Sequence, residues 1–430
     1  MMNLLRSIIA AHPRLFRNGS TLAMLFGSQA LGLLVSVVIA RQLDKTDAGV
    51  LFFSTGLITI SMSFTSLGLS SASRYYYLRN KNRKRSHRNM QIIFMAVFAA
   101  ILPSIGLSLF GLTMADDVDS SIVVFLGVLA LSCYFATFRQ LAQHIFVVEN
   151  KKSLSLLYDT VIFNAAFLVY LVLIPEKTVE AALWGLLAVS VTAGSIAFIQ
   201  LTREVGQEIV QRPSLLPQRR YARTILAISV PSMIAQAGGV ILNKIDVVMI
   251  GPLAGAVAVG DYSVALRLTY ITALGGTILM ALSTGRLVRV GVEGSARQVW
   301  SVMRKFTLIQ TGLVVAMSLP MFLFAEQIIT FMYGADYATS AMPFILLQAG
   351  KVLTAAFAPA LVMYTALGYN RDLARAMVVV VIVNVLLNFL LIPPLGATGA
   401  AWATLAGLAI MCGNYGYLMV RVRQRSLNPQ

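Results

Sequence analysis

Six ionisable residues lie inside long apolar stretches of this sequence, where a charged side chain is costly. They are Arg139, Asp159, Lys244, Asp246, Arg267 and Lys351. Such residues are usually retained because they pair, line a water-filled cavity or bind a substrate. Four of the six are cations, so a cavity that they share would favour an anionic substrate. Arginine also offers a fork of N–H donors that suits phosphate oxygens.

The depth of each charged residue within its apolar stretch separates the candidates. Arg267 and Asp159 lie within about 9 Å of the end of a stretch, so for them snorkelling or pairing at the membrane interface is favoured. Lys351 lies about 15 Å inside its stretch, and Arg139 also lies well inside. We therefore expect Arg139 and Lys351 to face a polar interior.

Polar neighbours strengthen the candidate around Arg139. Arg139 and Gln143 are four residues apart on a helix, and Gln140, Gln143 and His144 form an adjacent strip. This run of hydrogen-bonding groups would contact water or a ligand. Hydrogen bonds between helices explain any one of these side chains equally well.

A second candidate group surrounds Lys244. Asn243 lies beside it, whereas Lys244 and Asp246 are two residues apart and point to different sides of a helix. Asp246 could pair with another helix. Asp246 and Asp159 are the candidates for coupling transport to an ion gradient.

The elements that must position these residues are membrane helices. The chain of 430 residues is 58% hydrophobic and 12% charged, which is too little polar surface for a soluble protein. A bilayer core about 30 Å thick is crossed by roughly 20 apolar residues of helix. The sequence has twelve such stretches, near 21–40, 50–73, 90–112, 121–147, 155–175, 181–201, 224–250, 261–285, 303–325, 341–368, 373–393 and 396–420. We predict an all-α polytopic membrane protein with twelve transmembrane helices.

Basic residues alternate between the connections of these helices. Residues 74–88 alone hold seven Lys and Arg, and connections on the same side, with both termini, hold 27 in total. The alternate connections hold only Arg41, Lys45 and Lys177. The positive-inside rule then places both termini in the cytoplasm. Attraction to anionic membrane lipids explains the net charge of +17, so nucleic-acid binding is disfavoured.

No cofactor or metal is expected. The two cysteines, Cys133 and Cys412, fall inside predicted membrane helices, and the sequence has no CxxC, HExxH or GxxxxGK[ST] motif. Residues 1–19 lack a signal-peptide pattern and read as a cytoplasmic interfacial segment.

Two stretches of the chain show an internal repeat. Residues 173–185 match 391–403, which aligns Pro175 with Pro393 and Trp184 with Trp402. Six helices per repeat give both halves the same orientation, so the repeat is parallel. We predict a cytoplasmic segment, an N-lobe, a cytoplasmic loop, a C-lobe and a cytoplasmic tail, at 1–19, 20–202, 203–223, 224–420 and 421–430.

Several motifs resemble one transporter family. Residues 25–77 resemble the opening helix pair of bacterial polysaccharide flippases, the Wzx-type transporters of O-antigen repeat units. The segments 260–268 ("GDYSVALRL") and 387–404 are similar to the second-half counterparts. These flippases belong to the multidrug/oligosaccharidyl-lipid/polysaccharide exporter (MOP) superfamily, and the resemblance implies a MATE-like fold.

The resemblance also implies a substrate and a cellular location. The substrate would be an undecaprenyl-pyrophosphate-linked oligosaccharide, moved across the bacterial inner membrane by alternating access, without enzymatic chemistry. Arg139, Lys244 and Lys351 would compensate the pyrophosphate, while the Gln, Asn and His groups contact sugar. Polysaccharide polymerase and chain-length regulator proteins would be the protein partners, and membrane lipids would surround the polyprenyl tail between the lobes.

Three alternatives stay open. A multidrug or cation antiporter of the same fold would need an acid in a lobe cavity, for which Asp159 is the first-half candidate. A polymerase or glycosyltransferase would be an enzyme, but the longest outer connection, about 326–340, is short for a catalytic domain. A structural scaffold is disfavoured by the six intramembrane charges.

Overall fold

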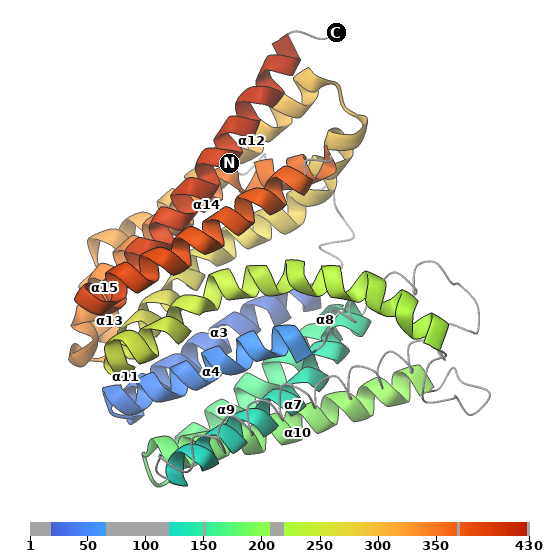
Figure 1. The fold of residues 1–430 in the computed structure, drawn as a ribbon. Coiled ribbons are helices and arrows are strands. Elements are labelled where there is room, and N and C mark those ends of the chain that lie inside the picture. The colour runs from blue at the N-terminus through green and yellow to red at the C-terminus, as the bar shows by residue number, and fades with distance from the viewer. Residues whose placement is uncertain (1–18, 66–119, 149–151, 207–218, 368–369, 428–430) are drawn as a thin grey trace. The chain divides into compact units, whose positions relative to one another are not determined.

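The described part of the chain is helical throughout. The structure, a computed structural model, describes residues 19–65, 120–148, 152–206, 219–367 and 370–427 (Figure 1). Every regular element in these ranges is a helix, which confirms the all-α prediction. The N-terminal segment up to residue 18, the basic loop 74–88 and the helix expected near 90–112 lie outside the described residues.

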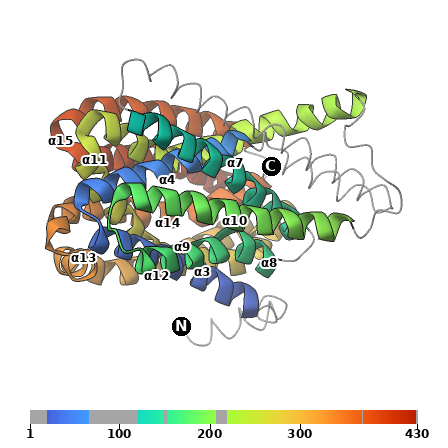
Figure 2. The same cartoon turned by 90° about the horizontal axis from the view of Figure 1, so that it is seen from below.

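Contacts divide the chain into two compact units, of which the first holds residues 20–248. Its elements are α3 (Gly19–Gln42), α4 (Lys45–Thr65), α7 (Ser120–Val148), α8 (Lys152–Leu156), the π-helical turn η1 (Leu157–Val161), α9 (Ile162–Leu173), α10 (Val179–Gly206) and the first part of α11 (Arg219–Glu293). The helix α7 packs along α10 and α4. In both views α9 lies beside α10 (Figures 1 and 2).

The second unit includes residues 249–430. It holds the rest of α11, followed by α12 (Ala296–Leu323), α13 (Ala325–Tyr333), the 3-10 turn η2 (Ala335–Ser340), α14 (Ala341–Ala366) and α15 (Asn370–Leu427). The helix α14 packs against both α12 and α15.

Among the described residues, seven segments are long and apolar enough to cross a membrane. They are 24–42, 125–143, 179–203, 244–280, 297–323, 335–364 and 375–417. The two longest each contain a glycine with a left-handed φ, 82° at Gly255 and 55° at Gly396. Residues other than glycine rarely adopt a positive φ, so each glycine permits a sharp turn of the backbone. Both α11 and α15 are therefore pairs of helices, as the sequence predicts.

Two polar turns lie together at one end of the first unit. Lys177 Nζ donates to Gln42 Oε1 at 2.9 Å, and the backbone N–H of Val179 donates to Asp47 Oδ2 at 3.2 Å. Both turns belong to the connections poor in basic residues. This contact agrees with the prediction that both connections lie on the same side of the membrane.

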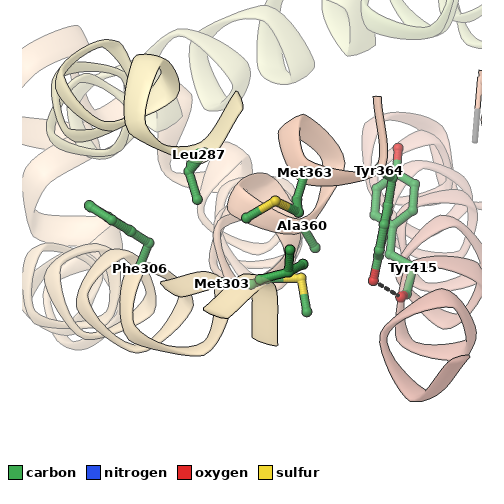
Figure 3. Packing of buried hydrophobic residues seen from close by; sticks show 8 residues of the cluster. Leu287, Met303, Phe306, Ala360, Met363, Tyr364 and Tyr415 are labelled. Atoms are coloured by element: carbon green, nitrogen blue, oxygen red, sulfur yellow. Dashed lines mark hydrogen bonds between the residues drawn. The ribbon is translucent and has the colours of Figure 1, made fainter. Parts of the chain in front are cut away.

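The second unit has an acidic end and a basic end. At the acidic end, Asp261 accepts hydrogen bonds from Thr339 and Ser340 of η2. At the opposite end, a buried core joins α11, α12, α14 and α15, and Tyr364 Oη donates to the carbonyl oxygen of Tyr415 at 2.8 Å (Figure 3). Exposed basic residues surround this core: Arg286, Arg289, Arg297, Arg304 and Lys305.

Burial supports the internal repeat. Ala182 and Ala400, which the repeat aligns, are both buried, at 1% and 0% exposure. The aligned Trp184 and Trp402 are both about half exposed, at 48% and 43%. Equivalent helix faces are therefore buried in the two units, and both indole rings remain available to the membrane interface.

Two features differ from the sequence expectation. The stretch 326–340 is not an open connection, because α13 and η2 fold within it and bury Tyr333 and Tyr337. Contacts also group 224–248 with the first unit, whereas the repeat assigns this helix to the second lobe. Compactness does not test the repeat, so the lobe boundaries stay a prediction.

Candidate functional site

The first candidate residue, Arg139, lies well inside α7 and is 7% exposed. Its guanidinium carbon lies 3.8 Å from the centroid of the Phe163 ring on α9. A desolvated cation–π contact of this kind contributes about 2 kcal/mol. The N–H donors of a guanidinium lie in its plane, so a ring over its face does not block them.

Polar groups continue along α7 on both sides of Arg139. Ser132, Arg139 and Gln143 follow each other at intervals of seven and four residues, so they lie on one face of the helix. The Oγ of Ser132 and the Oε1 of the neighbouring Gln140 are buried without a hydrogen-bond partner in the described part of the chain. Buried polar atoms normally bind water or a ligand when the protein offers no partner. We call Ser132, Arg139, Gln140 and Gln143 the α7 polar face; the side chain of His144 lies outside the described residues.

A π-helical turn follows α8 and carries Asp159. Ser155 Oγ donates to the carbonyl oxygen of Gln143 at 3.1 Å, which ties this segment to α7. The Tyr158 ring packs against Phe146 of α7, with centroids 5.7 Å apart. π-Helical turns occur frequently at functional sites. The sequence analysis did not predict this turn. The side chain of Asp159 lies outside the described residues, so its role stays a prediction.

Lys244 and Asp246 lie where α11 approaches α4. Lys244 is half-buried, and Asp246 is 1% exposed. A Cβ added at Gly56 of α4 would lie only 3.1 Å from Val247 Cγ1, so glycine permits the close approach of the two helices. Asp246 is buried next to this contact, and its pairing across helices stays a prediction. The side chain of Asn243 lies outside the described residues.

The second unit contains its own cationic group. Lys351 of α14 is half-buried, and its Nζ lies 5.7 Å from the centroid of the Tyr270 ring on α11. Arg267 is also half-buried and lies one helical turn from Tyr270. Arg267, Tyr270 and Lys351 therefore gather where α11 meets α14, and we call them the α11–α14 cationic group.

A buried polar network beside this group was not predicted. Gln348 Nε2 donates to Ser318 Oγ at 2.6 Å and to Thr272 Oγ1 at 2.8 Å, and all three residues are fully buried. This network joins α11, α12 and α14. In the sequence, this network could have been inferred only from the position of Gln348, which lies one helical turn before Lys351.

Two asparagines form a further buried pair on α15. Asn388 Nδ2 donates to Asn384 Oδ1 at 3.3 Å, and both residues are at most 1% exposed. The Nδ2 of Asn384 has no hydrogen-bond partner among the described residues. This donor is a polar group that the sequence candidates did not include.

The structure thus groups the candidates within each unit. The α7 polar face and Lys244 with Asp246 belong to the first unit, and the α11–α14 cationic group belongs to the second. A cleft shared by Arg139 and Lys351 stays a prediction. Within the described ranges, no group of three or more His, Cys, Asp or Glu is placed to hold a metal ion.

Comparison with known sequences identifies relatives. A family model described as polysaccharide biosynthesis protein matches residues 16–284, more than half of the chain. A protein of Haloferax volcanii described as a probable low-salt glycan biosynthesis flippase, Agl15, is 25% identical over 226 residues. The match covers 53% of this chain and 48% of that protein, so the chain aligns with about half of this relative's length.

Comparison with solved structures identifies the fold. Lipid II flippase MurJ, in an inward closed conformation, matches with a TM-score of 0.74 at 14% identity over 94% of this chain and 90% of that one. An inward-facing multidrug resistance MATE family transporter of the MOP superfamily also matches with a TM-score of 0.74. The identity is 13%, over 94% of this chain and 96% of that one. The expected MATE-like fold is confirmed; at these identities the likeness shows the fold alone.

Proposed function

Because the chain belongs to the polysaccharide biosynthesis protein family, we propose that it is a flippase for a lipid-linked oligosaccharide. The substrate is an undecaprenyl-pyrophosphate-linked repeat unit of O-antigen or exopolysaccharide, and the membrane is the bacterial inner membrane. Both termini lie in the cytoplasm. The observation that carries the proposal is the presence of four cations, Arg139, Lys244, Arg267 and Lys351, inside segments able to span a membrane.

The chemistry of the substrate explains this charge. A diphosphate diester is dianionic, and moving it through a hydrocarbon layer without counter-charges is prohibitive. At an effective dielectric constant of about 20, each unit charge placed about 4 Å from another contributes about 4 kcal/mol. Arg139, Lys244 and Lys351 neutralise the diphosphate, and Arg267 adds charge near Lys351.

The uncharged polar groups suit the sugar part of the substrate. Gln140 and Gln143 lie beside Arg139, and Gln140 has a buried oxygen without a partner among the described residues. Amide groups of this kind donate to and accept from sugar hydroxyls. His144 and Asn243 complete this set, and the polyprenyl tail stays in the membrane.

Alternating access of two similar lobes is the transport mechanism that this fold suits. The linker within 203–223 connects the lobes, and Asp159 and Asp246 are the candidates for ion coupling. The protein itself makes and breaks no covalent bond. A polysaccharide polymerase and a chain-length regulator act on the product at the outer leaflet.

The experiment that tests the proposal is complementation of a deletion strain. Without the chain, lipid-linked repeat units should accumulate in the cytoplasmic leaflet; expression of the parent chain should restore surface polysaccharide. Arg139→Ala and Lys351→Ala should each abolish restoration at unchanged membrane protein levels. Lys305→Ala, which removes an exposed lysine at the basic end, is the matched control and should restore it. Full restoration by both site variants would refute the proposed role of the cations.

Cation antiport is the second candidate, and the burial of Asp246 favours it. An antiporter needs a carboxylate that exchanges a proton or sodium ion for its substrate. If the chain conferred drug resistance that Asp246→Asn or Asp159→Asn removed, while no lipid-linked precursor accumulated in the deletion strain, antiport would replace the flippase proposal.

A further inference from the structure

The two arms of α15 line an open groove at the basic end of the second unit. Its volume is about 310 Å³, at the low end of the range for small-ligand sites. The lining residues are Asp372, Arg375, Ala376, Val379, Ile410, Asn414 and Tyr417. None of these residues belongs to the α7 polar face or the α11–α14 cationic group.

Charges of both signs lie at the mouth of the groove. Arg375 Nη1 lies 3.9 Å from Asp372 Oδ1, and the two side chains are 81% and 42% exposed. A surface ion pair of this length and exposure contributes little energy. Both groups are therefore available to a ligand that carries a negative and a positive charge.

A polar group without a protein partner lies deeper in the groove. The Oδ1 of Asn414 is buried and has no hydrogen-bond partner among the described residues. An unsatisfied amide next to a cavity is normally satisfied by water or a ligand. The Oδ1 is an acceptor, so an N–H or O–H donor of a ligand or of water satisfies it.

The polarity of the groove changes along the direction in which the helices run. Val379 lies about 6 Å further along the first arm than Arg375, and Ile410 lies about 10 Å from Tyr417 along the second. Val379 and Ile410 are 51% and 43% exposed although both lie in a membrane-spanning segment. Charged groups thus lie at the end of the helices and exposed apolar groups lie deeper, in the same order as the head and chains of a phospholipid.

We infer that this groove binds a phosphatidylethanolamine molecule of the leaflet at the basic end. The phosphate accepts hydrogen bonds from the Arg375 guanidinium. The primary ammonium donates to the Asp372 carboxylate and to the buried Oδ1 of Asn414. The first methylenes of one acyl chain lie against Val379 and Ile410. A zwitterionic head fits better than an anionic one because its ammonium compensates the charge of Asp372, whereas an anionic head leaves that carboxylate without a counter-charge.

Lipid binding to the purified full-length protein tests this inference. Native mass spectrometry in detergent would measure the dissociation constants of dioleoyl-phosphatidylethanolamine, -phosphatidylcholine and -phosphatidylglycerol. Phosphatidylcholine is the sharpest comparison, since it has the same charges but no N–H donor for Asp372. We expect about tenfold weaker binding of phosphatidylcholine, as for loss of one charge-assisted hydrogen bond. Equal affinities for the two zwitterionic lipids, or tighter binding of phosphatidylglycerol, would overturn the inference.

Variants locate the site. Arg375→Gln should weaken phosphatidylethanolamine binding about tenfold, and Asp372→Asn should remove the preference over phosphatidylcholine. Arg289→Gln is the matched control, because Arg289 is another exposed arginine at the basic end that pairs with an acid on its own helix, Glu293 at 3.2 Å. If Arg375→Gln and Arg289→Gln bound the lipid alike, the groove would not be the site. Displacement of the lipid by inorganic phosphate at equal concentration would overturn it in favour of a free-phosphate site.

Discussion

The ring of Phe163 on α9 covers one face of the Arg139 guanidinium on α7, with 3.8 Å between the guanidinium carbon and the ring centroid. This contact holds a charged group inside the first unit at 7% exposure. A lysine could not reproduce it, because an ammonium has neither the flat face that stacks on a ring nor the planar fork of donors. The arrangement therefore specifies arginine rather than positive charge alone.

Arg139→Lys should consequently reduce transport even though the charge is kept. We expect repeat-unit translocation to fall about tenfold, the usual effect of losing one charge-assisted hydrogen bond to phosphate. The measurement is surface polysaccharide in the complemented deletion strain, normalised to membrane protein level. Arg304→Lys, at an exposed position of α12, is the control. Parental transport by Arg139→Lys would mean that the fork of donors is not used.

Much of the helix pattern follows from local sequence. Long apolar stretches predict membrane helices because a spanning segment must satisfy its own backbone hydrogen bonds. The turn at Gly255 falls between two predicted stretches, and the turn at Gly396 lies at the first residue of the last stretch. Both turns depend on residues close together in the chain, so hydropathy and spacing are sufficient to predict them.

The polar contacts between helices could not be predicted in the same way. Gln348 meets Thr272 and Ser318 only when three helices take particular rotations about their axes, which hydropathy does not encode. The folding of 326–340 depends on the burial of Tyr333 and Tyr337 at the end of the second unit. The sequence predicted which cations lie within long apolar helices, but not that Phe163 would lie over the Arg139 guanidinium.

The Gln348 network should stabilise the second unit. Gln348→Leu removes the hydrogen bonds that join Gln348 to Thr272 and Ser318, each worth about 0.6 kcal/mol in membrane proteins on average. It leaves Ser318 and Thr272 bonded to backbone carbonyls. We expect the free energy of unfolding to fall by about 1 to 2 kcal/mol. Thermal or detergent-induced unfolding of the purified protein would measure it. Gln424→Leu, at an exposed site in α15, should change stability little; equal stability of the two variants would contradict the structural role.

Asp261 should anchor η2 through one of its oxygens. Thr339 and Ser340 both donate to Asp261 Oδ1, at 2.9 and 2.7 Å. Asp261→Asn keeps an acceptor at this position, whereas Asp261→Ala removes it and leaves two hydroxyls without their acceptor. We therefore expect Asp261→Ala to lower the free energy of unfolding by about 2 to 4 kcal/mol and Asp261→Asn by less than half as much.

Unfolding of the two variants, together with limited proteolysis of the segment around η2, would check this order. Faster cleavage in Asp261→Ala than in Asp261→Asn would locate the loss to the anchor. The reverse order of stability would show that the negative charge, rather than the acceptor at Oδ1, holds the segment.

The distribution of charge predicts the orientation of the second unit in the membrane. Its basic end carries the exposed residues Arg286, Arg289, Arg297, Arg304 and Lys305, whereas Glu326 and Asp336 lie at the other end. Short basic connections are retained in the cytoplasm because their translocation is disfavoured. The helix α13 and the turn η2 should therefore face away from the cytoplasm.

A matched pair of cysteine variants would measure this orientation. Glu293 and Glu326 are both exposed and lie at opposite ends of the unit, and the native Cys133 and Cys412 are 0% and 3% exposed, so they give little background labelling. A membrane-impermeant maleimide should label Glu326→Cys in intact spheroplasts, and Glu293→Cys only after permeabilisation. Because acidic residues have little influence on topology, neither substitution should itself reorient the chain. Labelling of Glu293→Cys in intact spheroplasts would mean that the basic end faces outward, and the substrate would then have to be loaded from the opposite side.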